Sequence, residues 1–387
     1  MQSSQFERIR VMRVIARMNV GGPAVQISEL MRTMDKNFFD HRLYTGFCSE
    51  DESDYLDSVA LDVNATRIHG LGKHISLRQD LMALKTLIVE IRKFKPHVIH
   101  THTAKAGFLG RLASLLSFQK SVRIHTFHGH LLNGYFGKIK RLIIVFLERS
   151  MANFTDQLLA VGEQVRQDLL DAKIGTPKKF EVMRPGLRIA ELPEKSGSRI
   201  SLGLNVNQLQ CAFIGRVTQI KRPDRFLDVV EEIQKRSINL NFFMAGDGDL
   251  LEYCRKRISE KKLPVTVLGW QNNLEQLISA ADIVILTSDN EGTPLSLIQA
   301  GMGGLPVVST HVGSVPEIVI DQVTGLVTSL NVVDIANALE KLVKDEKFRK
   351  LLGMSAQKFT LENFSVDSLV SNHEKLYKRL VFNQAMS

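Results

Sequence analysis

The sequence predicts an α/β protein with two doubly wound parallel-sheet domains. Short runs rich in β-branched residues alternate with segments of helical period along nearly the whole chain, which is typical of parallel strands joined by crossover helices. The alternation falls into two series, separated by a stretch crowded with Pro, Gly and Ser in which the periodicity is lost. We therefore expect two separate sheets.

The first series contains five expected strands and one well-marked helix. The strands are expected at residues 10–16, 97–102, 123–127, 157–161 and 181–183. One apolar helix face is predicted by a recurrence at steps of three and four, at Leu77, Leu81, Leu84, Ile88 and Ile91. This helix should end before Pro96.

The second series begins after residue 207. Its strands are expected at residues 211–215, 241–248, 265–269, 282–288 and 306–310, each followed by a helical pattern. These patterns divide the chain into an N-terminal domain at 1–190, a linker at 191–207 and a C-terminal domain beginning at 208.

Composition limits the classes of protein. The 387 residues carry a formal charge of +9, and 44% are hydrophobic, which is typical of a globular protein with buried cores. The charge is spread along the chain and indicates anionic partners such as phosphates or lipid headgroups. No nucleic-acid motif accompanies it, so we expect no nucleic acid as a partner. The three scattered cysteines are Cys48, Cys211 and Cys254, and we expect them to be small buried hydrophobes.

Apolar runs are short throughout the sequence. The longest spans 142–147, against the roughly 18 residues that a membrane-spanning helix needs. The N-terminus MQSSQFERIR lacks the apolar segment of a signal peptide. We therefore expect a cytoplasmic protein.

Ligands of open parallel sheets collect beyond the carboxyl ends of the strands. The first strand is followed by NVGGPAV, in which Gly21 and Gly22 permit close backbone approach and Pro23 suits a first helical turn. A tight strand-to-helix turn without a ligand is the alternative.

Five of the eleven histidines lie in HTHTAKAG (100–107) and HTFHGH (125–130). Metal binding must be weighed, but no Asp, Glu or Cys joins either group, and histidines at a strand end can also bind hydroxyls or phosphate. His100 and His125 are expected in the core, whereas His128, beyond its strand, is the stronger site candidate.

Cations stand at the start of a helix in FIGRVTQIKRPDRFLDVV. Arg216 follows a strand, and Lys221 and Arg222 precede the helix, at the end where the helix dipole disfavours positive charge. A bound anion such as a diphosphate would resolve this conflict. Solvated surface charges are the alternative.

The stretch NEGTPLSLIQAG (290–301) places the carboxylate of Glu291 close to a helix N-terminus that begins near Pro294. Capping by Thr293 or Glu291 would explain these residues as well as ligand binding would.

The second series also contains AGDGDLLEYC and VLGWQNNLEQL. With these runs the chain resembles the retaining GT-B glycosyltransferases of family four (glycosyl transferases group 1), most specifically over residues 211–327. The resemblance implies two Rossmann-like domains facing across a cleft, with the nucleotide-sugar donor bound at 208–362 and the acceptor at 1–190. It also implies that residues 363–387 form a helix crossing back to the N-terminal domain, and that the enzyme needs neither a metal nor another cofactor.

The family's functional residues map onto this sequence one position at a time. Arg216 and Lys221 match the pair that binds the diphosphate, and Glu291 matches the first acid of an E-x7-E motif that binds the transferred sugar. His128 matches a histidine that closes over the sugar. The other implied donor contacts are Gly21, Gly22, Gly215, Trp270, Leu274, Gly292, Thr293, Pro294, Leu295 and Gln299. His102 and Lys105 are expected on the acceptor side.

Gln299 departs from the family pattern, because it replaces the second acid, which contacts the ribose. The resemblance implies transfer of a hexose or N-acetylhexosamine from a nucleotide sugar, with UDP expected, to a glycan or lipid-linked acceptor in cell-surface polysaccharide synthesis. The configuration would be retained by front-face attack. A catalytically impaired binding partner, or a GT-B epimerase or phosphorylase, is the alternative.

Residues 131–151 interleave cations with apolar side chains: Lys138, Lys140, Arg141 and Arg149 with Tyr135, Phe136, Ile139, Ile143, Ile144 and Phe146. The pattern is typical of an interfacial helix on an anionic membrane. It is equally typical of a helix that packs on the sheet with its cations in water.

Overall fold

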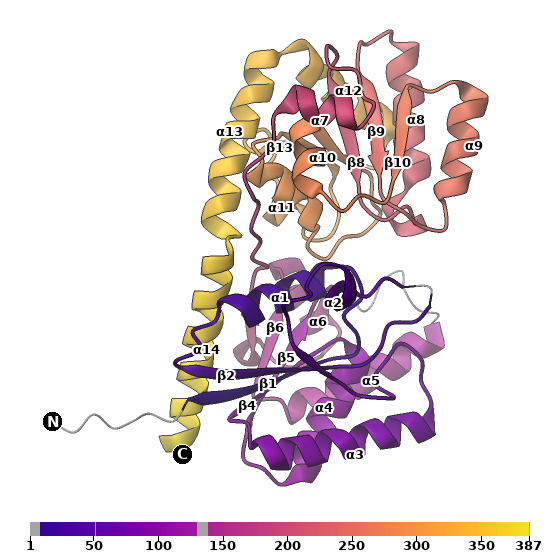
Figure 1. The fold of residues 1–387 in the computed structure, drawn as a ribbon. Coiled ribbons are helices and arrows are strands. Elements are labelled where there is room, and N and C mark those ends of the chain that lie inside the picture. Colours follow the sequence, from indigo (N-terminus) through magenta and orange to yellow (C-terminus); the bar gives the residue numbers. More distant parts are fainter. Residues whose placement is uncertain (1–7, 51, 130–137, 387) are drawn as a thin grey trace, which may run out of the picture. The chain divides into compact units, whose positions relative to one another are not determined.

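The computed structural model describes residues 8–50, 52–129 and 138–386. The chain forms two compact units, one made of Met1–Leu187 with Val366–Ser387 and the other of Arg188–Ser365. We call them the first and second domains. Each is built on one parallel sheet flanked by helices, which confirms the predicted class (Figure 1).

The first domain contains a seven-stranded sheet in the order β3-β2-β1-β4-β5-β6-β7. Its strands are β1 (Ile9–Ile15), β2 (Phe39–Thr45), β3 (Ala65–Arg67), β4 (Val98–His102), β5 (Val122–Phe127), β6 (Gln157–Ala160) and β7 (Phe180–Val182). Its helices are α1 (Gly22–Thr33), α2 (Tyr55–Ser58), α3 (Leu77–Phe94), α4 (Ala104–Ser117), α5 (Lys138–Asn153), α6 (Glu163–Asp171) and α14 (Val366–Met386), with a 3-10 turn at Pro177–Lys179.

Helices cover both faces of this sheet. Leu30 of α1 and Leu376 of α14 share a buried cluster with Val11 of β1. On the other face, α3 and α4 pack against Val14 and Ile99. The alternate strand residues thus feed two cores, as a doubly wound sheet requires.

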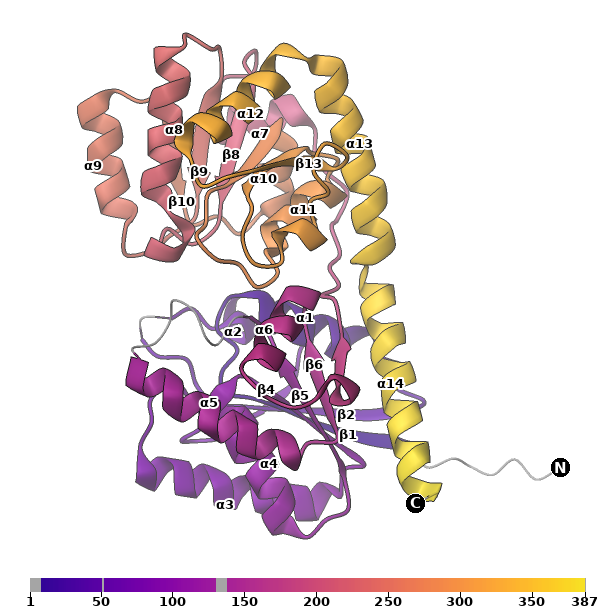
Figure 2. The ribbon, with the colours of Figure 1, turned by 180° about the vertical axis from the view of Figure 1, so that it is seen from behind.

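The second domain contains a six-stranded sheet in the order β10-β9-β8-β11-β12-β13. Its strands are β8 (Gln210–Ile214), β9 (Asn241–Ala245), β10 (Val265–Gly269), β11 (Ile283–Leu286), β12 (Val307–Thr310) and β13 (Gly325–Thr328). Its helices are α7 (Lys195–Ser201), α8 (Pro223–Lys235), α9 (Leu251–Lys261), α10 (Leu274–Ala280), α11 (Leu295–Met302), α12 (Val332–Lys344) and α13 (Glu346–Asn363), with 3-10 turns at Gln219–Lys221 and Val315–Glu317. The helices α8 and α12 pack on one face, and Figure 2 shows the domain from behind.

Residues 191–207, expected as a linker, belong to the second domain. They contain α7, whose Arg199 donates a hydrogen bond to the carbonyl of Ala280 at 2.9 Å and pairs with Asp282. The helix expected at 363–387 is α14, which lies in the first domain beside α1. Its Arg379 pairs with Glu181 at 2.6 Å.

The helix predicted to end before Pro96 is α3, which ends at Phe94 with Lys95 in the left-handed conformation. Its buried face agrees with the predicted one only in part. Ala83, Leu87, Ile91 and Phe94 are buried, whereas Leu77 and Leu81 are exposed. The prediction holds for Ile91, which is buried, and for Leu84 and Ile88, which pack against the same core. It fails for Leu77 and Leu81 in the first turns, because apolar residues occur on both sides of this helix.

A buried ion pair joins α4 to α5. Arg111 Nη2 lies 2.6 Å from Glu148 Oε2, and the two side chains are 0% and 3% exposed. Arg111 Nε also donates to the carbonyl of Gly107 at 2.7 Å. Removing one charge would leave the other buried and uncompensated.

We expect Glu148→Gln to lower the free energy of unfolding by about 3 kcal/mol, because the Arg111 charge would lose its partner. The measurement is denaturant-induced unfolding. Glu163→Gln is the control, since it breaks the exposed Glu163–Arg166 pair of α6 and should cost about 1 kcal/mol or less. If the two variants lost the same free energy of unfolding, the buried Arg111–Glu148 pair would contribute no more than an exposed pair, which would contradict this prediction.

Candidate active site

Two loops of the second domain, together with helix α11, carry most of the predicted site residues. One leaves β8 and contains Gly215, Arg216 and the 3-10 turn ending at Lys221, and the other leaves β11 and leads to α11. Because β8 and β11 are adjacent and parallel, both loops leave the same edge of the sheet. The chain continues from β8 to β9 on one side of this point and from β11 to β12 on the other. Open parallel sheets bind ligands where the direction of the connections reverses in this way.

Hydrogen bonds hold these two loops together. Thr287 Oγ1 donates to the carbonyls of Lys221 and Arg222, at 3.1 and 3.0 Å. The backbone N–H of Asp289 donates to the carbonyl of Ile220 at 3.0 Å. The β8 loop is therefore fixed to the end of β11 by its own backbone.

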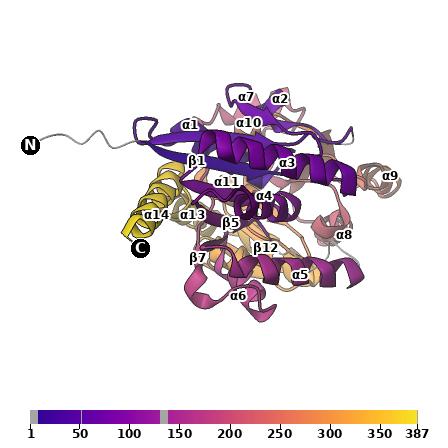
Figure 3. The ribbon, with the colours of Figure 1, turned by 90° about the horizontal axis from the view of Figure 1, so that it is seen from below.

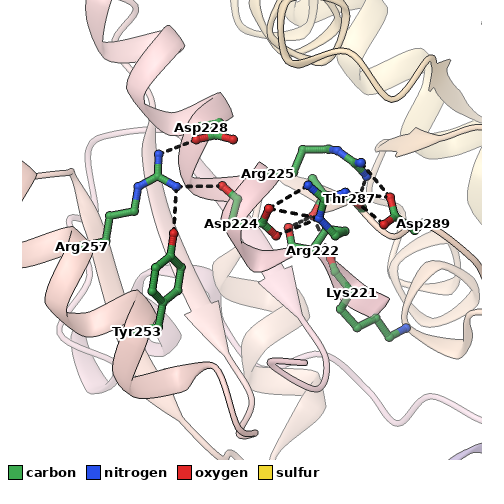
Figure 4. A network of polar contacts seen from close by, with 9 residues as sticks. All are labelled: Lys221, Arg222, Asp224, Arg225, Asp228, Tyr253, Arg257, Thr287 and Asp289. Atoms are coloured by element: carbon green, nitrogen blue, oxygen red, sulfur yellow. Dashed lines mark hydrogen bonds and ion pairs between the residues drawn. The ribbon is translucent and has the colours of Figure 1, made fainter. Parts of the chain in front are cut away.

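Asp289 anchors the start of α8. Its carboxylate accepts from Arg222 Nη1 at 3.0 Å and from Arg225 Nη2 at 2.7 Å (Figure 4). Arg222 also pairs with Asp224 at 2.7 Å, and this hydrogen bond holds the pKa of Asp224 below its ordinary value.

The structure thereby corrects one expectation about this helix start. The positive charge of Arg222 at the N-terminus of α8 is offset by Asp224 and Asp289. It therefore needs no bound anion, and its side chain belongs to the scaffold of the loops.

Lys221 and Glu291 form an ion pair across the two loops. Lys221 Nζ lies 2.5 Å from Glu291 Oε1, and Ser288 Oγ donates to the same oxygen. Both side chains are largely buried, with 17% and 9% exposure. A cation and an anion are thus held side by side at the carboxyl ends of β8 and β11.

Arg216 is a third charged residue of this region, in the same loop as Lys221. Its side chain is exposed and has no hydrogen-bond or ion-pair partner within the described ranges. The preceding Gly215 is fixed by donating its N–H to the carbonyl of Ala245 at 3.0 Å. Arg216 is therefore a cation on an anchored backbone.

Helix α11 begins at Leu295, in agreement with the start predicted near Pro294. Pro294 is its N-cap, in an extended conformation without a side-chain cap. Gly292, Thr293 and Leu295 are partly buried at this end. Gln299 lies one turn beyond Leu295 and is partly exposed, and its side-chain amide makes no hydrogen bond to any group that the structure describes.

The loops after β9 and β10 flank the β8 loop. Gly246 follows β9 at φ +146°, and a Cβ atom there would lie 1.9 Å from the carbonyl oxygen of Gly215. The run AGDG thus lets two loop backbones pack directly. Beyond β10, the half-exposed Trp270 donates its indole N–H to Asn272 at 2.7 Å, and Leu274 begins α10.

In the first domain, the predicted residues follow β1, β4 and β5. Gly21 is the N-cap of α1, without a side-chain cap, and Gly22 is the first helical residue. Lys105 lies in the first turn of α4, where its ammonium pairs with Asp80 at 2.6 Å and donates to the carbonyl of His74.

The histidines of β4 and β5 form a hydrogen-bonded cluster. His102 Nδ1 lies 2.7 Å from His128 Nε2, and His102 Nε2 lies 2.8 Å from a guanidinium nitrogen of Arg13. His102 is 2% exposed and both of its ring nitrogens are engaged within the cluster. Neither nitrogen is available to bind the glycan acceptor, in contrast to the expectation from the sequence. His100 and His125 are fully buried.

Burial keeps these imidazoles neutral. It lowers the pKa of His128 to about 3, with a further contribution from the Arg13 charge, and lowers the pKa of His102 well below its ordinary value. Across the described ranges, no group of three or more His, Cys, Asp or Glu side chains is arranged to hold a metal ion. None of the helices in those ranges is long and apolar enough to span a bilayer.

Several residues of this site were missed by sequence reasoning. Arg13 had a signal, since it is a charge in the middle of an apolar strand pattern. Asp289 lies directly after β11, where ligand-binding residues are expected, but its role in fixing Arg222 depends on tertiary contacts. Tyr377, which contacts Arg13, is 364 residues away in sequence, and no local pattern marks it.

Two family models match the chain. One, described as glycosyl transferases group 1, matches residues 195–359, and the other, glycosyltransferase family 4, matches residues 20–191. Together they cover most of the sequence, one on each domain. The chain belongs to glycosyltransferase family four and is a glycosyltransferase.

Curated relatives cover most of the chain at low identity. An Escherichia coli UDP-Gal:alpha-D-GlcNAc-diphosphoundecaprenol alpha-1,3-galactosyltransferase is 27% identical, over 86% of this chain and 87% of its own. The Escherichia coli O-antigen biosynthesis glycosyltransferase WbnH is 23% identical, over 91% and 96%.

The fold is that of known structures. A crystal structure of Anabaena Alr3699/HepE in complex with UDP and glucose superimposes with a TM-score of 0.82 at 17% identity, covering 96% of this chain and 100% of that one. The fold is GT-B, with two Rossmann-like parallel-sheet domains.

Proposed function

We propose that this protein is a retaining glycosyltransferase that transfers a hexose or N-acetylhexosamine from a UDP-sugar to a glycan or lipid-linked acceptor in cell-surface polysaccharide synthesis. The observation that carries the proposal is the Lys221–Glu291 ion pair, which lies at the carboxyl ends of β8 and β11. The loop that contains Lys221 also contains Arg216. The names of relatives that use UDP-Gal or act in O-antigen biosynthesis support the donor and the pathway class.

Arg216 and Lys221 would bind the diphosphate of the donor. Arg216 has a guanidinium without a partner in the described part of the chain, and that group suits bidentate recognition of phosphate oxygens. Lys221 is already fixed by Glu291, so little reorganisation would be needed as charge develops on the leaving group. These two cations would do the work that a metal ion does in other transferases.

Glu291 would accept hydrogen bonds from hydroxyls of the transferred sugar. The backbone N–H groups of Gly292, Thr293 and Leu295 precede or begin α11 and would bind phosphate or sugar oxygens. Pro294 has no amide hydrogen and serves to shape the turn. In the first domain, Gly21 and Gly22 would approach the diphosphate, and His128 would contact the sugar.

The nucleoside would lie beside Gly215, with Trp270 and Leu274 near the base and Gln299 at the ribose. An amide has one acceptor oxygen, whereas a carboxylate can accept from two hydroxyls at once. Gln299 therefore lowers the affinity for the ribose and does not affect the transfer step. On the acceptor side, Lys105, which pairs with Asp80, would contact the glycan acceptor. The buried His102 would lie behind the site without touching the acceptor.

The transfer would follow front-face attack. The bond between the anomeric carbon and the diphosphate oxygen breaks, the acceptor oxygen bonds to the same face, and its proton passes to the departing diphosphate. Arg216 and Lys221 stabilise the charge on that leaving group. Glu291 is engaged by Lys221 and Ser288 and orients the sugar rather than forming a glycosyl bond.

We also propose that the first domain attaches peripherally to an anionic membrane at the cytoplasmic face. Leu142, Ile143 and Phe146 of α5 are exposed, and α3, α4 and α5 lie side by side (Figure 3). Exposed apolar residues next to cations favour an interfacial helix. Residues 131–137 of the predicted segment lie outside the described residues, as do the side chains of 138–141.

The function is tested with a panel of nucleotide sugars. Thermal stabilisation should be greatest with a UDP-sugar, and the product formed with an undecaprenyl-diphosphate glycan acceptor should keep the anomeric configuration of the donor when examined by NMR. An inverted product would overturn the mechanism. Binding without transfer or donor hydrolysis would favour the impaired binding partner.

Arg216→Ala should lower kcat by about a hundredfold, because a charged hydrogen bond to a developing anion is worth about 2–4 kcal/mol. Its unfolding free energy should change by about 0.5 kcal/mol or less, since the side chain is exposed. Lys221→Ala should lose as much activity and also some stability, because Glu291 would lose its cation. The control Arg255→Ala changes a half-exposed arginine of α9 and should keep its rate. Near-normal activity of Arg216→Ala would contradict the site.

Leu142→Ser/Phe146→Ser should weaken co-sedimentation with vesicles containing phosphatidylglycerol by at least about tenfold, because burial of each side chain contributes about 1.5–3 kcal/mol. Wild-type binding should also weaken as salt rises. The control Leu351→Ser/Met354→Ser removes two exposed apolar residues of α13 and should bind normally. Equal binding by the two double variants would exclude α5 as the attachment site.

A further inference from the structure

Arg13 is a buried cation at the centre of the first sheet. Its side chain is 0% exposed in the middle of β1. Nε donates to His41 Nε2 at 3.0 Å, Nη1 to His102 Nε2 at 2.8 Å, and Nη2 to Tyr377 Oη at 2.6 Å. Among the described residues, none of its hydrogen bonds goes to a carboxylate.

The guanidinium determines which nitrogens carry protons. An arginine side chain has donors and no acceptor, so His102 Nε2 must present its lone pair to Arg13. A neutral His102 then carries its proton on Nδ1, which lies 2.7 Å from His128 Nε2. His128 Nε2 is therefore an acceptor, and the proton of a neutral His128 resides on Nδ1.

We propose that Arg13 is a positioning residue that acts through His102 to hold His128 as the neutral tautomer with its proton on Nδ1, so that His128 donates a hydrogen bond to an oxygen of the donor sugar. The contact with the sugar rests on the proposed function, whereas the tautomer follows from the hydrogen bonds within the first domain. His128 Nδ1 has no hydrogen-bond partner in the described part of the chain, which leaves this donor for a ligand.

The surroundings oppose protonation of His128. The titratable and charged groups of this cluster come from every element packed around it: Arg13 of β1, His41 of β2, His100 and His102 of β4, His125 of β5, Arg111 of α4, and His373 and Tyr377 of α14. Burial and the Arg13 charge lower the pKa of His128. A protonated His128 would also direct an N–H at the N–H of His102, which costs the hydrogen bond between them.

A second branch of the cluster supplies a matched control. Tyr377 Oη accepts from Arg13 and lies 2.6 Å from His100 Nδ1, and His100 Nε2 lies 2.7 Å from Thr126 Oγ1. This branch ends at Thr126 in the core. Its His100 stacks on His102, with ring centroids 4.4 Å apart, but makes no hydrogen bond to His128 in the described part of the chain. Tyr377→Phe therefore disturbs the same buried cluster while leaving the line from Arg13 through His102 to His128 in place.

The tautomer is tested directly by NMR on the full chain labelled with ¹⁵N-histidine. The signals of His102 and His128 are assigned from the spectra of His102→Gln and His128→Gln. We expect both rings to be neutral at pH 6 to 7 and to carry the proton on Nδ1. A cationic His128, or one with its proton on Nε2, would overturn the proposal, whether or not the protein transfers sugar.

Kinetics then tests the role of Arg13. Arg13→Met should lower kcat/KM for the donor by roughly tenfold, the effect of one misoriented hydrogen bond. Because the variant lacks the Arg13 charge, the pKa of His128 should rise toward its ordinary value, and an acid limb should appear at higher pH than in the wild type. Tyr377→Phe should keep the wild-type rate and pH profile.

Two results distinguish positioning from a purely structural role. If Arg13→Met and Tyr377→Phe lose activity equally and keep the wild-type pH profile, Arg13 only supports the fold and the proposal is wrong. If Arg13→Met does not fold, the tautomer measured in the wild type and in Tyr377→Phe still decides. Absence of any transferase activity would count against the proposed function, and the NMR result would stand by itself.

Discussion

In each sheet, candidate site residues lie where the direction of the strand connections reverses. In the first sheet the order β2-β1-β4-β5 places this point between β1 and β4, and in the second the order β9-β8-β11-β12 places it between β8 and β11. Loops on either side of such a point diverge and leave their backbone groups accessible at the carboxyl edge. The chain uses both points, since Gly21 follows β1, Arg216 follows β8 and Glu291 follows β11.

Loops that diverge in this way do not pack against each other along their length, so other contacts must fix their conformations. In the second domain, polar contacts do so. Thr287 and Asp289 bind the backbone of the β8 loop and the arginines at the start of α8. Lys221 and Glu291 then meet as a largely buried pair. In a poorly hydrated site such a pair is stronger than in water. Donor binding would therefore encounter charges that are already oriented, which is the condition for stabilising a leaving group efficiently.

The sequence predicted the fold class because short runs rich in β-branched and apolar residues alternate with segments of helical period in both series. It missed β2 and β3, in which charged residues such as Asp40 and Arg42 interrupt the pattern at one side of the first sheet. It also missed β13, the short edge strand of the second sheet. For the candidate site, the sequence indicated which loops to consider, since their residues follow strands directly. It could not predict the pairing of Arg222 with Asp289, or that of Arg13 with Tyr377, because these contacts join segments far apart in the chain.

The two domains treat charge in opposite ways. In the second, most described cations of the loops are matched by carboxylates, as Arg222 is by Asp224 and Lys221 by Glu291. In the first, Arg13 is surrounded by imidazoles and a phenol. A carboxylate beside Arg13 would cancel its charge and favour protonated histidines. Because the partners of Arg13 are neutral, its charge continues to oppose protonation of the surrounding histidines, and His128 stays a neutral hydrogen-bonding group.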